Sequence, residues 1–273
     1  MSDIVLTAGV RANLLQLQST AVTITNTQSK LATGKRVNSA LDNPINFFTA
    51  QGLSNRASDL GNLLDSMSTA ISTIQAANNG LTSITKLVQS AQALASQAQQ
   101  TSDVTVRAGL ATQFDAIKTQ IDQLAGDSGF NGINLLDSAN STDLTVQLNE
   151  RNTSSVTVNA VDSTSVGLAI NNATNNWAAA ADITAASGEL TSALTTLRSQ
   201  SQAFGSQLST VQIRQDFTKA MVNTLQSGSD ALTLADSNEE GANLLALQTR
   251  QQLSTTALSL ASQASQAVLR LFQ

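Results

Sequence analysis

The sequence has no cysteine, no histidine and no tyrosine, and it has only one proline, one tryptophan and 3% aromatic residues. Imidazole and thiol groups supply the commonest general base, the commonest transition-metal ligands and a strong nucleophile. Their absence makes an enzyme the least expected class of function, and we expect no cofactor and no metal site. A chain without cysteine is also indifferent to the redox state of its compartment.

Charge and apolar runs narrow the choice of partners further. The net charge is −5 and only 12% of the residues are charged. Nucleic-acid affinity rests on clustered Lys and Arg, so we predict no nucleic-acid partner. No run reaches about 18 apolar residues, so we predict no membrane insertion. The segment MSDIVLTAGVRANLL lacks the pattern of a cleaved secretory signal, and export by another route stays open.

Both ends of the chain carry apolar or small residues at alternating steps of three and four, which is the spacing of a coiled-coil seam. The C-terminal seam consists of Ala257, Ala261, Ala264, Val268 and Leu271. The N-terminal seam, interrupted by Gln28, consists of Val10, Leu14, Leu17, Ala21, Ile24 and Leu31. Seams of mostly small residues bury little apolar area, so each helix is marginal alone. We predict that the two ends pair, that neighbouring copies complete the pairing, and that both ends are disordered in the free subunit.

The first half of the chain predicts three helices. The first ends at Gly34, and Asn43 followed by Pro44 marks the N-cap and first position of the second. The second has some 55 residues and a length of about 80 Å. The third follows a loop at residues 100–103 and ends near Gly126. Together with a later helix, they supply a predicted rod core of Leu53, Leu60, Leu64, Met67, Ile71, Ile74, Leu110, Phe114, Ile117, Leu194, Leu197, Phe204 and Leu208.

The second half of the chain begins with a change of period. Alternating apolar residues between 144 and 158 predict a β-hairpin. Helical spacing resumes at about Trp177 and runs to a predicted break at Gly228, and Ser237 with Glu240 predicts a capping box for the last helix. We therefore predict a mainly α fold: an elongated helical-bundle or coiled-coil rod with paired N- and C-terminal helices and a small β-hairpin region.

Three motifs are similar to those of bacterial flagellin, the subunit of the flagellar filament. They are QSKLATGKRVNSALDN, the stretch GFNGINLL, and LLALQTRQQLSTTALSLASQASQAVLRLF at residues 244–272. The resemblance covers nearly the whole chain and implies a structural subunit that self-assembles into a filament for motility. Asn43 and Pro44 are also similar to the hook–filament junction protein, a flagellin relative, which stays as the alternative. A cytoplasmic coiled-coil signalling hairpin is more remote, since it would lack the β-region and the terminal motifs.

The resemblance implies a division into domains and a set of partners. Residues 1–42 with 237–273 would form an inner, channel-lining domain, and residues 43–236 an outer rod with the hairpin region at about 138–176. That interval is too short for the large outer domains of longer flagellins. The implied partners are the chain itself as a helical homopolymer, an export chaperone at the C-terminal helix, the hook-associated junction and cap proteins, and the flagellar type III export apparatus. The implied location is extracellular, in the filament.

The resemblance also implies positions for an innate-immune receptor that docks on the outer domain. Alignment on the Leu-Ala-x-Gln motif puts Leu94 at the motif leucine, Ser90 where recognised flagellins carry an arginine, and Ala93 where they carry a glutamate. A second alignment puts Gln113 where another acid is usual. Loss of these charges predicts weak docking.

Two charged pairs have simpler interpretations. Lys35 and Arg36 lie either in a solvated turn or at a contact with a neighbouring subunit, and the sequence favours neither. Glu239 and Glu240 are most simply helix-start residues that complement the macrodipole.

Overall fold

The structure, a computed structural model, describes residues 8–138 and 142–271, and at residues 265 and 268–271 it describes only the helix backbone. The elements in chain order are α1 (Ala8–Thr33), α2 (Pro44–Gln99), α3 (Val104–Asp127), β1 (Leu144–Gln147), β2 (Ser155–Val158), the 3-10 helix η1 (Thr174–Trp177), α4 (Ala180–Thr233) and α5 (Ser237–Leu271). The predicted mainly α fold with a small β-hairpin is confirmed.

The chain divides into two compact units. The first, called here the terminal unit, comprises residues 1–55 and 224–273, and the second, called the central unit, comprises residues 56–223. The division falls inside α2 and α4. The N–H of Arg36, in the linker before α2, donates to the carbonyl of Thr233 at 2.8 Å, and Ser229 Oγ donates to the carbonyl of Ala50 at 3.2 Å. These bonds join the end of α4 to that linker and to the start of α2.

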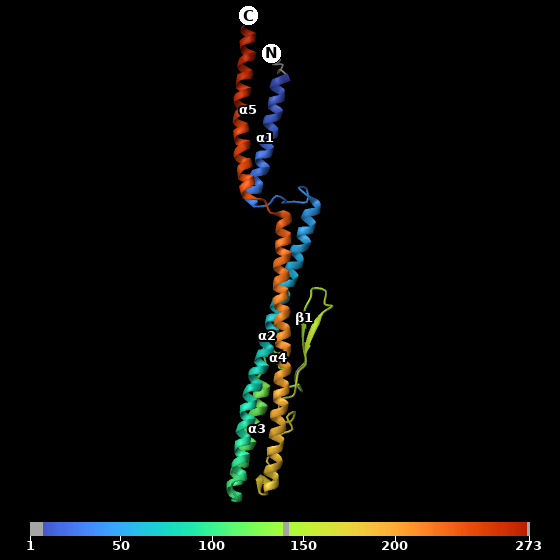
Figure 1. Ribbon diagram of the computed structural model, residues 1–273, viewed down its shortest axis with the longest axis vertical. Coiled ribbons are helices and arrows are strands. Elements are labelled where there is room, and N and C mark those ends of the chain that lie inside the picture. Colours follow the sequence, from blue (N-terminus) through green and yellow to red (C-terminus); the bar gives the residue numbers. More distant parts are fainter. Residues whose placement is uncertain (1–7, 139–141, 272–273) are drawn as a thin grey trace. The chain divides into compact units, whose positions relative to one another are not determined.

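In the terminal unit, α1 and α5 lie side by side and antiparallel, so that the start of α1 and the end of α5 lie at the same end of the pair (Figure 1). Gly34 follows α1 with φ of +68°, a conformation that glycine adopts without steric cost. Asn43 caps α2 by accepting the N–H of Asn46 at 3.0 Å, and Pro44 is the first helical residue. Both boundary predictions are confirmed.

Two predicted boundaries in the terminal unit are wrong. Helix α4 does not break at Gly228 but continues to Thr233. A Cβ at Gly228 would lie 3.4 Å from Leu53 Cδ1, so the glycine allows close packing there and the packing outweighs its poor helix propensity. The cap of α5 is Asp236, whose Oδ1 accepts the N–H groups of Asn238 and Glu239 at 2.9 and 3.3 Å. The predicted capping box of Ser237 therefore does not form.

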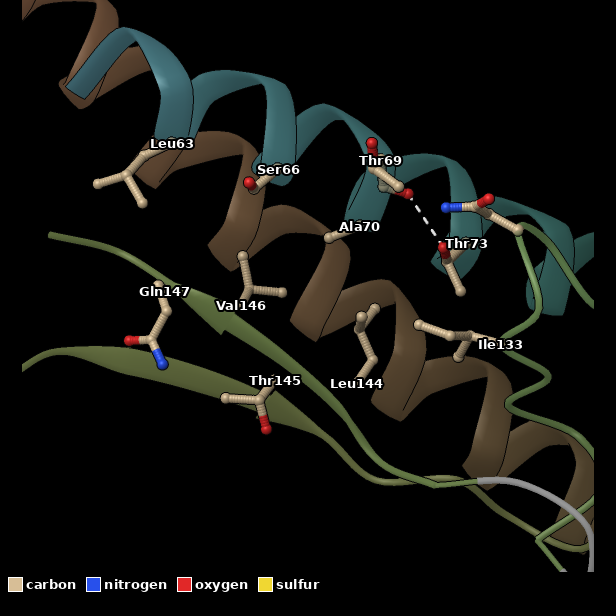
Figure 2. A pocket seen from close by; sticks show the side chains of 11 residues that line it. Leu63, Ser66, Thr69, Ala70, Thr73, Ile133, Leu144, Thr145, Val146 and Gln147 are labelled. Carbon is tan, nitrogen blue, oxygen red and sulfur yellow. Dashed lines mark hydrogen bonds between the residues drawn. The ribbon is translucent and has the colours of Figure 1, made fainter. Parts of the chain in front are cut away.

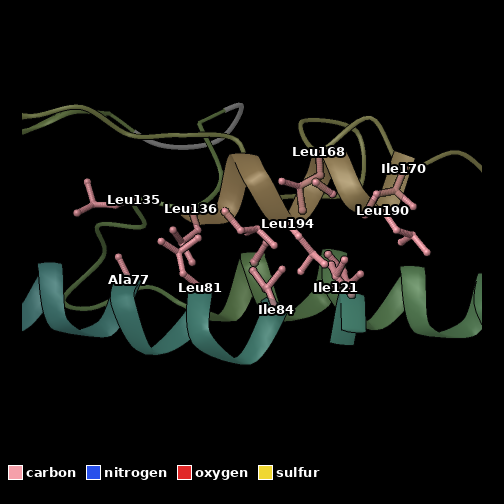
Figure 3. Packing of buried hydrophobic residues seen from close by; sticks show 14 of the residues in the cluster. Ala77, Leu81, Ile84, Ile121, Leu135, Leu136, Leu168, Ile170, Leu190 and Leu194 are labelled. Carbon is pink, nitrogen blue, oxygen red and sulfur yellow. The ribbon is translucent and has the colours of Figure 1, made fainter. Parts of the chain in front are cut away.

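The central unit has one hydrophobic core, to which α2, α3, α4 and the loops between them all contribute. Figure 3 shows Leu81 and Ile84 of α2 facing Leu190 and Leu194 of α4, with loop side chains such as Leu136 closing the cluster. Among the residues assigned to the rod core, those fully buried are Leu60, Met67, Ile74, Leu110, Phe114, Leu194, Leu197 and Phe204. Those packed partly buried against the same cluster are Leu64, Ile71, Ile117 and Leu208. Leu53 is half-buried in the terminal unit.

The single tryptophan marks the start of α4. Trp177 is fully buried, with its ring centroid 5.0 Å from that of Phe114. Helix α4 begins at Ala180, later than predicted, because Asn175, Asn176 and Trp177 all have positive φ and cannot continue into an α-helix. This turn carries the indole into the core between α3 and α4.

The β-hairpin packs along α2. Strands β1 and β2 are antiparallel, with Val146 opposite Val156 and Leu144 opposite Val158. Figure 2 shows Leu144 and Val146 pointing toward the helices and Thr145 pointing away. Beyond the strands, Arg56 Nε of α2 lies 2.7 Å from Oε1 of Glu150 in the hairpin turn. The hairpin is thus attached to α2 by one apolar face and one ion pair.

Candidate assembly surface

The seam between α1 and α5 includes polar residues that the sequence pattern did not single out. On α1 the buried side chains are Thr20, Ile24 and Thr27, continued on both sides by partly buried Leu17 and Leu31. On α5 the partly buried residues follow the same spacing: Leu244, Leu247, Gln251, Ser254, Leu258 and Ala261. Thr20 is accommodated because its hydroxyl donates to the carbonyl of Gln16 at 2.8 Å, which leaves its methyl group for the seam. The seam therefore buries little apolar area.

The predicted seam residues divide between this contact and the outer surface. On α1, Ile24 is buried, Val10, Leu17 and Leu31 are half-buried, and Leu14 and Ala21 are exposed. On α5, Ala261 is half-buried while Ala257 and Ala264 are exposed. The side chains of Val268 and Leu271 lie outside the described part of the chain. The exposed members leave much of their surface open to solvent.

Large apolar side chains also lie outside the seam. Leu15 and Val22 of α1 are 66% and 61% exposed, and on α5 Leu245, Leu253 and Leu260 are 67%, 67% and 62% exposed. Steps of seven and eight residues keep each set on one side of its helix. Apolar rows that are exposed to solvent are typical of an interaction site.

One ion pair joins the two terminal helices. Lys30 Nζ near the end of α1 lies 2.9 Å from Oε1 of Glu240 in the first turn of α5. A groove of about 410 Å³ lies beside this pair, and it is also lined by Glu239 and Arg250. Glu239 and Glu240 occupy the first turn of α5, where a negative charge complements the helix dipole.

The linker between α1 and α2 is held by side-chain hydrogen bonds. Asp42 Oδ2 accepts the N–H groups of Ser39 and Asn38, each at 2.9 Å. These N–H groups, that of Ser39 first, hold the pKa of the Asp42 carboxyl below its ordinary value. Arg36 donates from its guanidinium to the carbonyl of Ala231 at 2.9 Å, in the last turn of α4. The charge of Arg36 thus faces the negative end of α4, while Lys35 is exposed.

The receptor-equivalent positions lie on α2 and α3 of the central unit. Ser90, Ala93 and Gln113 are exposed, and Leu94 is partly buried against the core. Ser90 Oγ donates to the carbonyl of Lys86 at 3.0 Å, within its own helix. The exposed positions therefore present uncharged side chains to solvent.

These features define a class of protein. Within the described ranges, no helix combines the length and apolar character of a membrane span, and no cluster of three or more acidic residues is placed to hold a metal ion. The surface features that stand out are apolar rows on a thinly packed pair of terminal helices. Such a surface is typical of a structural subunit that associates with other chains.

Comparisons with known proteins identify the family. The family model for the bacterial flagellin N-terminal helical region matches residues 7–141, and that for the C-terminal helical region matches residues 187–272. Flagellins FljM and FljK of Caulobacter vibrioides are each 32% identical to the chain over 267 residues, which is 97% of this chain and 97% of each relative. A Brucella melitensis flagellin is 27% identical over the full length of both chains. The crystal structure of Bacillus cereus flagellin is similar with a TM-score of 0.49 and 25% identity, over 57% of this chain and 88% of that one.

The chain belongs to the bacterial flagellin family. It is a structural subunit of the flagellar filament, which serves motility. The family is one of structural proteins that assemble into filaments.

Proposed function

We propose that the α1–α5 pair is the surface through which copies of this chain polymerise. The observation that carries the proposal is the exposure of Leu245, Leu253 and Leu260 along α5, outside a seam that includes the polar residues Thr20, Thr27 and Gln251. The free pair thus has a seam that is only partly apolar and leaves apolar rows in solvent. Packing between copies would bury those rows.

The free energy gained by burying the exposed side chains supports an assembly made of many small contacts. Full burial of one exposed leucine contributes about 1.5–3 kcal/mol, so a side chain that is two-thirds exposed contributes roughly 1–2 kcal/mol. A few such residues on each helix are enough to offset the entropy lost on association when each subunit makes several contacts. The exposed residues of the predicted seams, Leu14, Ala21, Ala257 and Ala264, take part in the same contacts in this proposal.

The proposed domain roles follow from the family. Residues 1–42 with 237–273 form the inner domain that lines the channel, and residues 43–236 form the outer rod. Between residues 138 and 177, the described residues hold only the hairpin, short turns and η1. This supports a filament without large outer surface domains.

The proposed partners are those of a flagellin during export and assembly. The unassembled C-terminal helix presents Leu253 and Leu260 to solvent, which gives an export chaperone an apolar row to cover. The flagellar type III apparatus exports the chain without a cleaved signal, and the filament lies outside the cell between the junction and cap proteins. No catalytic role belongs to this proposal.

Electron microscopy of reassembled protein tests the proposal. Heat-dissociated full-length chain, returned to high concentration with seeds, is expected to form long hollow filaments. A chain lacking residues 244–273 is expected to form none, although its central unit keeps its fold by circular dichroism. Filaments from the truncated chain, or only short rings from the full chain, would contradict the proposed role of α5.

A further inference from the structure

A groove between α2 and α4 of the central unit carries two cations without an acidic partner. The groove has a volume of about 360 Å³, and both Lys86 of α2 and Arg198 of α4 line it. Both residues are exposed. Neither Lys86 nor Arg198 belongs to an ion pair among the described residues.

The charged donors of the groove are Lys86 and Arg198. Leu81 and Leu197 contribute apolar surface, and both are buried. The hydroxyls of Thr82 and Thr85 already donate to carbonyls within α2, at 2.9 and 2.7 Å. The ammonium of Lys86 and the guanidinium of Arg198 are therefore the strongest groups for binding an incoming anion, and Gln89 and Ser201 supply neutral donors beside them.

The rest of the central unit supplies the complementary charge. Most of its carboxylates already accept hydrogen bonds or pair with a cation, as Asp122 does with Ser165 and Glu150 does with Arg56. Asp59 and Asp65 are among the exceptions: both are exposed on α2, and no hydrogen bond or ion pair of their side chains is found among the described residues. Asp127 at the end of α3 is also exposed without such a partner, but it stands alone, whereas Asp59 and Asp65 put two carboxylates in one segment.

The two kinds of charge lie too far apart to meet within one chain. Asp65 and Lys86 are on the same helix, and a separation of 21 positions corresponds to about 32 Å along its axis. The carboxylates of Asp59 and Asp65 can therefore reach the groove of Lys86 only in another molecule. In a chain of net charge −5, a groove with two free cations is a local exception that favours a carboxylate partner.

We propose that the groove of Lys86 and Arg198 binds the Asp59 and Asp65 segment of a second copy of this chain. The contact is heterologous, because the groove of α2 and α4 and the Asp59–Asp65 segment of α2 are different surfaces. A heterologous contact that does not close into a ring extends an open helical polymer. The inference rests on the proposed polymerisation and adds a polar contact in the central unit to the apolar contacts of the terminal helices.

Reversing the charges on each of the two surfaces tests the proposed contact between copies. The double variant Lys86→Glu with Arg198→Glu is expected to raise the critical concentration for filament growth about tenfold at about 50 mM salt, and by much less at about 1 M salt. The variant Asp59→Lys with Asp65→Lys is expected to show the same loss. The quadruple variant has the net charge of the wild type and is expected to recover a critical concentration within about twofold of the wild-type value.

A matched control separates the groove from net charge. Arg151 and Arg214 are exposed, lie outside the groove, and belong to no ion pair among the described residues. The variant Arg151→Glu with Arg214→Glu changes the net charge equally and is expected to polymerise nearly as the wild type does. An equal loss in this control, or no recovery in the quadruple variant, would overturn the proposal.

Zero-length crosslinking tests the same contact without a mutation. A carbodiimide joins a lysine amine to a carboxylate in direct contact, and mixing of light and heavy isotope-labelled chains identifies links between copies. Mass spectrometry is expected to find Lys86 linked to Asp59 or Asp65 across copies, in filaments or in concentrated solution. If wild-type chains form no filaments, the proposed function fails, and an absence of this link at high concentration would then overturn the groove contact separately.

Discussion

Lys30 Nζ of α1 lies 2.9 Å from Oε1 of Glu240 of α5, and this ion pair joins helices that are 210 positions apart in the chain. The Lys30 side chain is 35% exposed and that of Glu240 is 13% exposed. Because the seam beside it contains Thr27 and Gln251, the pair is a polar anchor for a weakly packed contact. We expect it to set the register of α1 against α5.

A double-mutant cycle measures the coupling free energy between Lys30 and Glu240. Lys30→Ala, Glu240→Ala and the double variant are expected to give a coupling free energy of about 0.5 kcal/mol in urea titrations, because a partly exposed pair is screened by solvent. The coupling should fall at about 1 M salt. Lys35→Ala, in an exposed lysine of the same unit, is the control and should change stability by less than about 0.5 kcal/mol. A coupling of zero would show that register is set without the pair.

Substitution of the exposed leucines of α5 is expected to weaken polymerisation and to leave the stability of the central unit unchanged. Leu253→Ser and Leu260→Ser are each expected to raise the critical concentration for polymerisation about tenfold, corresponding to about 1.4 kcal/mol of lost contact. Sedimentation of filaments measures the change. The unfolding midpoint of the central unit should not move, because these side chains lie outside it. Unchanged polymerisation in both variants would mean that the exposed leucines remain uncovered in the filament.

Two substitutions at the contact between Phe114 and Trp177 test the packing of the central-unit core. Phe114→Ala is expected to cost about 3–5 kcal/mol, because it removes a fully buried ring that packs on Trp177. Trp177→Phe is expected to cost less, since the indole Nε1 is buried without a hydrogen-bond partner and its removal loses no bond. Denaturant titrations followed by circular dichroism give both values. Equal costs for the two variants would contradict this ranking.

The attachment of the hairpin to α2 should weaken at low pH. The pKa of Glu150 lies below its ordinary value, chiefly through its own main-chain N–H and then, against the opposing effect of burial, through the charge of Arg56. The stabilisation from Glu150 is therefore fully present above its unfolded-state pKa of about 4.3 and is lost as the pH falls through the lower folded-state pKa. The protection factors of the Val146 and Val156 amides, which correct for the pH dependence of intrinsic exchange, should fall below about pH 4. Glu150→Gln should remove this pH dependence, and an unchanged acid response in that variant would point to another group.

The uncharged surface at the receptor-equivalent positions predicts weak activation of the innate-immune receptor by the purified monomer. The triple variant Ser90→Arg, Ala93→Glu, Gln113→Glu is expected to raise the response, because it restores charged groups that can form paired hydrogen bonds. Ser209→Arg, at an exposed position of α4, is the control. Strong signalling by the wild-type monomer at ordinary flagellin doses would contradict the prediction.

Local signals in the sequence were sufficient where one residue type controls the backbone. Gly34 ends α1 with a positive φ, and Asn43 with Pro44 begins α2, as their side-chain chemistry predicts. The hairpin followed from strict alternation between Leu144 and Val158. These features depend on neighbours in the chain, so one sequence specifies them.

Features that depend on tertiary contacts were not predictable in this way. Gly228 looked like a helix stop, but α4 passes through it because Leu53 of α2 packs there against the glycine. Asp236 and Ser237 are both good capping residues, and spacing alone could not decide between them. Thr20 and Thr27 were missed as seam residues because they are polar, although they continue the spacing of Leu17 and Ile24.

The most direct test of the account is hydrogen exchange of the terminal helices in two states of the same protein. Amides between residues 10 and 31 and between 244 and 271 are expected to exchange rapidly in the monomer, because the pair alone buries little apolar area, and to become protected in the filament. Amides of α3 should stay protected in both states. Full protection of the terminal amides in the monomer, or no gain on polymerisation, would contradict the claim that other copies of the chain complete this surface.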